Sequence, residues 1–182
     1  RLPQRYMLFV GSIEERKNLL LAVEALAQLQ DKELHLVAVG RRTPYVQQVL
    51  DRARRLGVTS RLHLLHQVGA TYLPGFYGGA EVFVYPSRFE GFGIPIIEAL
   101  NAGVPVIGAT GSCLEEAGGP TSLYTDPDNA DMLASLIDRV LIDISLRRLM
   151  IDEGRSYVER FTPKRIARDL SQVYEQVMLT YE

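Results

Sequence analysis

Cysteine and tryptophan are scarce in this chain of 182 residues, which has one cysteine, Cys113, and no tryptophan. A single cysteine excludes an internal disulfide and fits a reducing compartment. No hydrophobic run approaches the roughly 20 residues that a membrane-spanning helix needs. Lysines and arginines number 20 against 22 aspartates and glutamates, so no basic excess indicates nucleic acid as a partner. We therefore expect a cytoplasmic protein. Arginines concentrated between residues 41 and 61 leave peripheral contact with the inner face of a membrane as an open alternative.

What the chain does contain is typical of one soluble globular domain. Hydrophobic residues make up 47% of it, and the formal net charge is −2. The length suffices for one domain with a sizeable core. Because the chain starts at Arg1 and a strand pattern follows almost at once, we expect residues 1–182 to be a single domain of a longer protein.

Short apolar segments alternate with helical patterns through the first two thirds of the chain. We expect strands at 6–10, 35–39, 61–65, 82–85, 105–109 and 122–124, with helices between them at 19–30, 44–56, 71–77, 95–102 and 113–117. Strands that are apolar on both faces and separated by helices indicate a covered parallel sheet. The pattern predicts an α/β fold: a Rossmann-like, doubly wound parallel sheet of about six strands with helices on both faces. After the sheet, only helices are expected, at 129–141, 145–161 and 163–181.

The most informative segment runs from Glu90 to Glu98, two glutamates separated by seven residues. It follows the strand expected at 82–85 and leads into a helix. Gly91 and Gly93 let a ligand approach the backbone, and the free N–H groups of the helix N-terminus favour anions and oxygen-rich ligands. A carboxylate accepts hydrogen bonds from two adjacent hydroxyls, as a sugar diol offers. Both carboxylates facing one pocket would be typical of a sugar-nucleotide site.

Residues 86–107, from Pro86 through Ile107, resemble the core block of retaining GT-B glycosyltransferases of the family-4 type, which carry an E-x7-E motif. The resemblance extends over nearly the whole chain and includes Phe9-Val10-Gly11, Arg16-Lys17-Asn18, Leu123 to Pro127 and Phe161-Thr162-Pro163. It implies one half of a GT-B fold, the C-terminal donor-binding domain. The N-terminal acceptor domain would then be absent from this chain.

The resemblance also implies roles for individual residues. Glu90 would contact the transferred sugar and Lys17 would hold the diphosphate, so these two are the catalytic candidates. Glu98 would bind the ribose hydroxyls. The other donor-binding candidates lie in the two loops that carry these residues: Gly11, Ser12, Arg16, Gly91, Phe92, Gly93 and Ile94.

Ser12 departs from the family pattern, since many members have an arginine directly after the strand's glycine. Either Arg16 compensates or the phosphate clamp is weaker than usual. Val68, Gly69, Tyr72 and Leu73 lie where the family's base-binding loop usually falls. No role follows from the resemblance for Arg41 and Arg42.

The implied activity is retaining transfer of a sugar from a GDP- or UDP-linked donor to an acceptor hydroxyl, without a metal or other cofactor. The acceptor would be a glycan or glycolipid of the cell envelope, bound by the missing domain, and the Arg16-Lys17-Asn18 pattern favours a mannosyl or related deoxyhexose donor. The isolated domain is expected to bind nucleotide without transferring sugar.

Other functions remain open at this point. They are a sugar-nucleotide epimerase or phosphorylase of the same fold and a non-enzymatic nucleotide-binding module. A glycoside hydrolase also uses two carboxylates, but it would leave the cationic loop at Lys17 unexplained.

Two further motifs are expected to be structural. Asp126-Pro127-Asp128 has a D-x-D form that binds divalent metal in another glycosyltransferase fold, but here it precedes a helix, and Asp128 with Asp131 is expected to cap that helix. His63 and His66 lie three residues apart in an extended segment, so they point to opposite faces and predict no zinc site.

Overall fold

The computed structural model describes residues 2–180, and a six-stranded parallel sheet organises them. The strands are β1 (Tyr6–Val10), β2 (His35–Val39), β3 (Leu62–Leu65), β4 (Val82–Tyr85), β5 (Val106–Ala109) and β6 (Leu123–Thr125). Their order is β3-β2-β1-β4-β5-β6, which confirms the predicted α/β fold. Because the chain order reverses between β1 and β4, their carboxyl ends border the crevice where doubly wound folds bind ligands.

Each central strand is buried on both faces. Met7 pairs with Leu36 of β2 and with Val82 of β4, and every residue of β1 is buried. Successive side chains point to opposite faces of a strand, so Met7 and Phe9 enter one core while Tyr6, Leu8 and Val10 enter the other. Burial on both sides explains why these strands are uninterrupted apolar runs.

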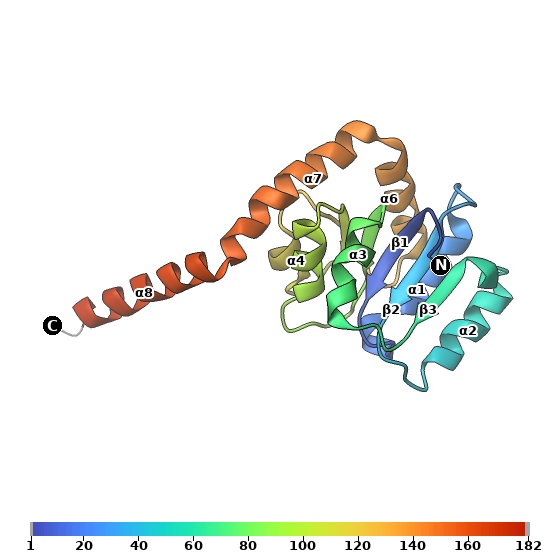
Figure 1. Ribbon diagram of the computed structural model, residues 1–182, viewed down its shortest axis with the longest axis horizontal. Helices are drawn as coiled ribbons and strands as arrows, with labels where there is room; N and C mark the ends of the chain where they lie inside the picture. Colours follow the sequence, from blue (N-terminus) through green and yellow to red (C-terminus); the bar gives the residue numbers. More distant parts are fainter. Residues whose placement is uncertain (1, 181–182) are drawn as a thin grey trace.

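Helices cover both faces of the sheet (Figure 1). The first core contains side chains from α1 (Leu19–Gln28), α2 (Val46–Arg55) and α6 (Ala130–Ile142). The second contains side chains from α3 (Leu73–Gly78), α4 (Ile94–Asn101) and α5 (Leu114–Gly118). Helix α7 (Ile144–Val158) joins the two, because Met150 packs in the first core and Val158 in the second.

The last helix, α8 (Pro163–Thr180), leaves the body of the domain and extends away from it (Figure 1). Every residue from Thr162 to Met178 is exposed. The expected end of this helix, Tyr181, lies outside the described residues. Across the part of the chain that the structure covers, no helix combines the length and apolar character needed to cross a membrane.

The structure shifts several predicted boundaries. The helix expected at 71–77 is a 3-10 turn, η3 (Ala70–Tyr72), followed by α3, because Pro74 lacks an N–H and fits the first turn of a helix. Arg61 belongs to the 3-10 turn η2 (Thr59–Arg61), not to β3, and its guanidinium donates to the backbone oxygens of Leu26, Asp31 and Leu34. The helix expected at 145–161 ends at Val158 and is followed by the turn η4 (Glu159–Phe161).

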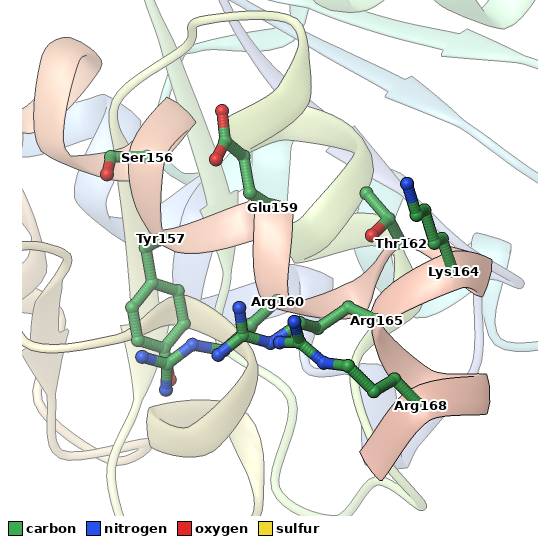
Figure 2. A pocket seen from close by; sticks show the side chains of 8 residues that line it. All are labelled: Ser156, Tyr157, Glu159, Arg160, Thr162, Lys164, Arg165 and Arg168. Atoms are coloured by element: carbon green, nitrogen blue, oxygen red, sulfur yellow. The ribbon is translucent and has the colours of Figure 1, made fainter. Parts of the chain in front are cut away.

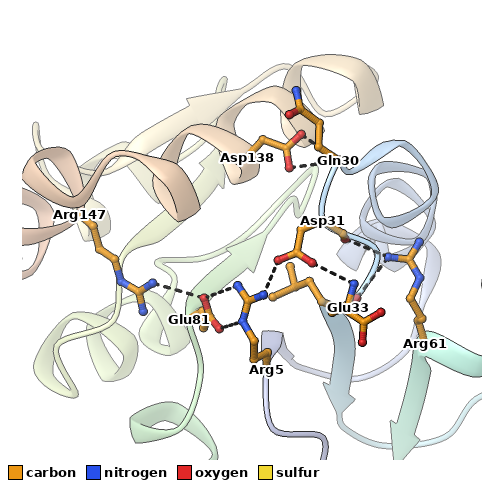
Figure 3. A network of polar contacts seen from close by, with 9 residues as sticks. Arg5, Gln30, Asp31, Glu33, Arg61, Glu81, Asp138 and Arg147 are labelled. Atoms are coloured by element: carbon orange, nitrogen blue, oxygen red, sulfur yellow. Dashed lines mark hydrogen bonds and ion pairs between the residues drawn. The ribbon is translucent and has the colours of Figure 1, made fainter.

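A network of charged side chains fastens the amino ends of the strands (Figure 3). Arg5, just before β1, donates to Glu81 Oε1 at 2.6 Å and to Asp31 Oδ2 at 2.6 Å. Arg147 of α7 reaches Glu81 Oε2 at 3.4 Å. Glu81 precedes β4, so its carboxylate ties that strand to β1 and to α7. The network lies at the opposite edge of the sheet from the crevice between β1 and β4.

We predict that Glu81→Gln lowers the free energy of unfolding by about 1–2 kcal/mol, because two arginines lose their charged acceptor. Urea unfolding at neutral pH measures the change. Glu33→Gln removes the same charge from an exposed residue nearby and serves as the control, with an expected change within about 0.5 kcal/mol. Equal effects of the two substitutions would contradict a structural role for the network.

Candidate functional site

The loop after β1 places Lys17 across the carboxyl end of that strand. A Cβ built on Gly11 would lie 3.7 Å from the Lys17 Cδ and Cε atoms, so the lysine side chain passes directly over this glycine. Gly40, at the end of β2, approaches so closely that its Cβ would lie 1.7 Å from the Gly11 backbone oxygen. Only glycine fits at position 40, and the two loops are therefore packed backbone against backbone.

Lys17 and Glu90 form a buried ion pair at this crevice. Lys17 Nζ lies 2.5 Å from Glu90 Oε1 and donates to Tyr85 Oη at 2.5 Å. Ser87 Oγ donates to the same carboxylate oxygen at 2.6 Å. The two charged side chains are only 10% and 9% exposed, so they interact in a medium that screens charge less than water does. The structure thus brings the two predicted catalytic residues into direct contact.

Burial and hydrogen bonding act in opposite directions on Glu90. Burial alone would raise the pKa of its carboxyl, but the hydrogen bonds from Lys17 and Ser87 outweigh burial and hold the pKa below its ordinary value. Burial, followed by the neighbouring Glu90 charge, raises the pKa of the Tyr85 hydroxyl. Glu90 is therefore a stable carboxylate at neutral pH, and Tyr85 is neutral.

Arg16 brings a second cation to Glu90. Its Nη1 atom lies 3.4 Å from Glu90 Oε1 and donates to the Phe89 backbone oxygen at 3.1 Å, while Nη2 pairs with Glu14 at 2.8 Å. Lys17 and Arg16 belong to the 3-10 turn η1 (Glu15–Lys17), which the sequence analysis did not predict. Ser12 lies at the start of this loop, where its backbone oxygen accepts from the Glu14 N–H.

Asn18 fastens the cationic loop to its neighbours. It adopts a left-handed conformation with φ of 57°, which asparagine tolerates better than most residues. Its Nδ2 atom donates to the Pro86 oxygen at 3.0 Å and to the Pro127 oxygen at 2.8 Å. The loop is thus held against the end of β4 and against the segment that follows β6.

The loop from Gly91 to Gly93 leads into α4 as predicted. Gly93 has φ of +108° and a Cβ there would lie 2.9 Å from Leu114 Cδ2, so both backbone and space require glycine. Helix α4 begins at Ile94, which is 63% exposed. Its second residue, Pro95, has no N–H, and the Ile96 N–H donates to the Gly93 backbone oxygen at 2.9 Å. The Phe92 ring packs edge-on against Phe161, with ring centroids 5.4 Å apart.

Glu98 contacts a different part of the domain from Glu90. Tyr77 of α3 donates to Glu98 Oε2 at 2.7 Å, and both residues line a cleft of about 420 Å³ between α3 and α4. Burial, and then the hydrogen bond to Glu98, raises the pKa of the Tyr77 hydroxyl. The Tyr77 ring is tilted against Phe83, and Phe83 stacks on Tyr85, with centroid distances of 5.5 and 5.7 Å. A row of three aromatic rings therefore connects the surroundings of Glu98 to the Lys17–Glu90 pair.

A second hollow lies at the carboxyl ends of β2 and β3. It measures about 620 Å³ and is lined by Arg41, Arg42, His66, Gln67 and Val68 together with the ends of the strands. The backbone oxygen of Arg41 accepts from the Ile13 N–H, which places this hollow beside the cationic loop. Of the positions assigned by resemblance to a base-binding loop, Val68 lines it, while Leu73 lines the cleft that holds Glu98.

The two motifs expected to be structural make structural contacts. Asp128 pairs with Arg88 at 2.6 Å, and Asn129, not Asp128 as predicted, caps α6 by accepting from the Met132 N–H at 2.8 Å. Asn129 can do so because it directly precedes the first helical residue. His63 contacts His35 and His66 contacts the Gly40 oxygen, so the two histidines have separate partners. No cluster of potential metal ligands occurs among residues 2–180.

Three polar partners were missed by the sequence analysis: Tyr85 and Ser87, which contact the ion pair, and Tyr77, which holds Glu98. Tyr85 carried a usable signal, because it ends an otherwise apolar strand and a buried tyrosine hydroxyl needs a hydrogen-bond partner. Ser87 and Tyr77 carried no such signal. The contact of Ser87 with Glu90 depends on how the loop between them folds, and the contact of Tyr77 with Glu98 depends on how α3 packs against α4.

The crevice can bind and stabilise an anion. Two cationic side chains and the N-terminus of α4, which begins at Ile94, lie where strand order reverses, and the Glu90 carboxylate offers an acceptor for hydroxyl groups. No side chain among those described at this crevice is arranged as a nucleophile with an adjacent histidine base.

Comparison with known proteins gives the family. The profile of the family "Glycosyl transferases group 1" matches residues 1–157. The O-antigen chain mannosyltransferase B of Escherichia coli is 34% identical over 165 residues, which cover 87% of this chain and 42% of the relative. The MMP alpha-(1->4)-mannosyltransferase of Mycolicibacterium hassiacum is 29% identical over 165 residues, covering 88% of this chain and 39% of the relative.

Solved structures agree. Sucrose-phosphate synthase from Thermosynechococcus elongatus has a TM-score of 0.85 at 30% identity, covering 97% of this chain and 46% of that one. Anabaena HepE in complex with UDP and glucose has the same fold, with a TM-score of 0.85 at 20% identity over 95% of this chain and 49% of that one. The chain spans less than half the length of these relatives. Its fold is that of a GT-B glycosyltransferase domain, and the chain belongs to the group 1 glycosyl transferases.

Proposed function

We propose that this domain binds the nucleotide diphosphate sugar of a retaining glycosyltransferase, as the C-terminal half of a GT-B enzyme. The observation that carries the proposal is the buried Lys17–Glu90 pair, which sets a cation and a carboxylate side by side at the strand-order reversal. A nucleotide sugar needs both: a cation for its diphosphate and an acceptor for its sugar hydroxyls. The names of the relatives, two mannosyltransferases and a structure with UDP and glucose, support it.

Lys17 and Arg16 are proposed to hold the diphosphate. Breaking the bond between sugar and nucleotide leaves negative charge on the diphosphate oxygens, and fixed cations stabilise that charge in the transition state. Arg16 reaches the same carboxylate as Lys17, so it can take the place of the arginine that the family often has at position 12. The N–H groups of Gly91, Phe92, Gly93 and Ile94 would complete the donor contacts. Gly11, whose N–H donates to the Val39 oxygen, and Ser12 would border the diphosphate beside Lys17. In this arrangement the positive charge would come from Lys17 and Arg16, with no metal.

The two glutamates are proposed to bind different hydroxyls. Glu90 would accept from the transferred sugar beside Lys17. Glu98 would accept from the ribose, with Tyr77 holding its second oxygen. The base would then lie toward the hollow at the ends of β2 and β3. In such an arrangement the acceptor hydroxyl attacks the face that the nucleotide leaves, and the departing phosphate takes its proton.

The remaining elements of the activity belong to the whole enzyme. An acceptor glycan or glycolipid would be bound by a preceding domain, since the chain spans less than half of its relatives. The names of the relatives favour a mannosyl or similar hexosyl donor used in polysaccharide synthesis. The purified 182-residue chain is expected to bind nucleotide and to transfer no sugar.

Calorimetric titration with GDP, UDP, ADP and their sugar conjugates tests the donor site. We expect one nucleotide to bind, and Glu98→Gln to weaken its binding by about tenfold, because the ribose loses a charged acceptor. The same substitution should leave the affinity for the 2′,3′-dideoxy form of that nucleotide unchanged. Glu153→Gln, which removes an exposed charge on α7, is the control. Equal weakening of the ribo and dideoxy forms would refute ribose binding by Glu98.

The Lys17–Glu90 pair also predicts a pH dependence of stability. Because the pKa of Glu90 is lowered in the folded protein, its charge stabilises the fold above the ordinary glutamate pKa, and this contribution is lost as the pH falls through the lowered pKa. We expect Glu90→Gln to reduce the free energy of unfolding by about 3 kcal/mol at neutral pH, since a buried lysine loses its counter-charge. Urea unfolding from roughly pH 3 to 7 should show that difference shrink below the ordinary glutamate pKa of about 4.3. A difference that is the same at every pH would argue against the ion pair.

A further inference from the structure

A further hollow, here called the elbow hollow, lies where the chain turns between α7 and α8, and its residues are separate from those of the crevice between β1 and β4. It measures about 610 Å³ and is lined by Ser156, Tyr157, Glu159, Arg160, Thr162, Lys164, Arg165 and Arg168. Figure 2 shows the side chains of Arg160, Arg165 and Arg168 running toward the Tyr157 ring, while the Glu159 carboxylate points away from them. None of these residues belongs to the proposed donor site.

The positive charge of this elbow hollow is only partly compensated within the described residues. Four cationic side chains and one carboxylate line it. Asp169 is the acidic partner that the structure gives two of the arginines, at 3.8 Å from Arg165 Nε and 3.7 Å from Arg168 Nε. One carboxylate shared at these distances leaves most guanidinium N–H groups free to bind another acceptor. Like charges held in one hollow attract a multivalent anion.

One wall of the elbow hollow is fixed in advance. Arg160 stacks over the Tyr157 ring with its Cζ atom 4.0 Å from the centroid. Tyr157 in turn donates to the Glu116 backbone oxygen at 2.6 Å and packs edge-on against Phe161. A guanidinium placed in this way loses less freedom when it binds a ligand. Phe161 also packs against Phe92, so ring contacts run from Tyr157 of the elbow hollow to the loop that precedes α4.

We propose that the elbow hollow binds a phosphate-bearing anion. Planar guanidinium groups match the oxygens of a phosphate two at a time, and a phosphate ester carries about −1.5 to −2 charge against −1 for a carboxylate. The volume leaves room for the phosphate together with part of the molecule that carries it. The source of the phosphate is either a soluble phosphorylated molecule or the headgroup of an anionic lipid.

The first arm of the test is a titration with inorganic pyrophosphate followed by NMR of the arginine Nε–Hε signals. We expect the signals of Arg160, Arg165 and Arg168 to move together with one dissociation constant, separately from Arg16 in the proposed donor site. Arg165→Gln should weaken the binding reported by Arg160 by about fivefold or more. Arg54→Gln, which removes an equally exposed arginine from α2, should change it by less than about twofold.

The second arm identifies the source of the phosphate by co-sedimentation with vesicles of phosphatidylglycerol, with phosphatidylcholine vesicles for comparison. Vesicle binding that Arg165→Gln with Arg168→Gln abolishes, and that Arg54→Gln with Arg55→Gln preserves, would support the site and assign it to lipid headgroups. Pyrophosphate binding without vesicle binding would support it for a soluble phosphorylated molecule. The proposal is overturned if neither probe binds, or if the elbow and control variants lose binding equally. Because the donor site is measured through Arg16, its failure would be seen separately.

Discussion

The ion pair between Lys17 and Glu90 joins two loops whose strands are adjacent in the sheet but far apart in the chain. Lys17 follows β1 and Glu90 follows β4, the two strands between which the sheet order reverses. Tyr85 accepts a hydrogen bond from Lys17, Ser87 donates one to Glu90, and Arg16 adds a second cation. Two charges this well buried are tolerated only when each partner is present, because an unpaired buried charge is costly. The loop after β1 that carries Arg16 and Lys17, the loop from Gly91 to Gly93 and the start of α4 are all positioned around this contact.

The charged network around Arg5 and the proposed donor site lie at opposite edges of the same sheet. At the amino edge, Arg5 and Glu81 form a network that ties strands to α7. At the carboxyl edge, the backbone is brought close by glycines, and Gly40 and Gly93 admit no side chain without collision. Parallel strands favour this division, since all their carboxyl ends and the loops that follow them meet at one edge.

Much of the fold and part of the site were predictable from the sequence. Buried parallel strands are continuous apolar runs, so β1, β2 and β4 were predicted with the right ends. The motifs singled out Lys17 and Glu90 as candidates, but they did not predict that the two side chains contact each other. Tyr77 could not be found, because its bond to Glu98 depends on how α3 packs against α4. The sequence analysis did not single out the charges at 160–168, which come together in one hollow only through the turn of the chain between α7 and α8.

The most direct test of this account compares a nucleoside diphosphate with its nucleoside on the wild-type chain and on Lys17→Gln. If Lys17 holds the diphosphate, the substitution weakens the diphosphate by about tenfold to a hundredfold and leaves the nucleoside unaffected. Lys32→Gln, an exposed lysine near the amino edge, should change neither affinity. If Lys17→Gln left the affinity for the diphosphate unchanged, or weakened both ligands equally, the buried pair would be structural and the central claim would be wrong.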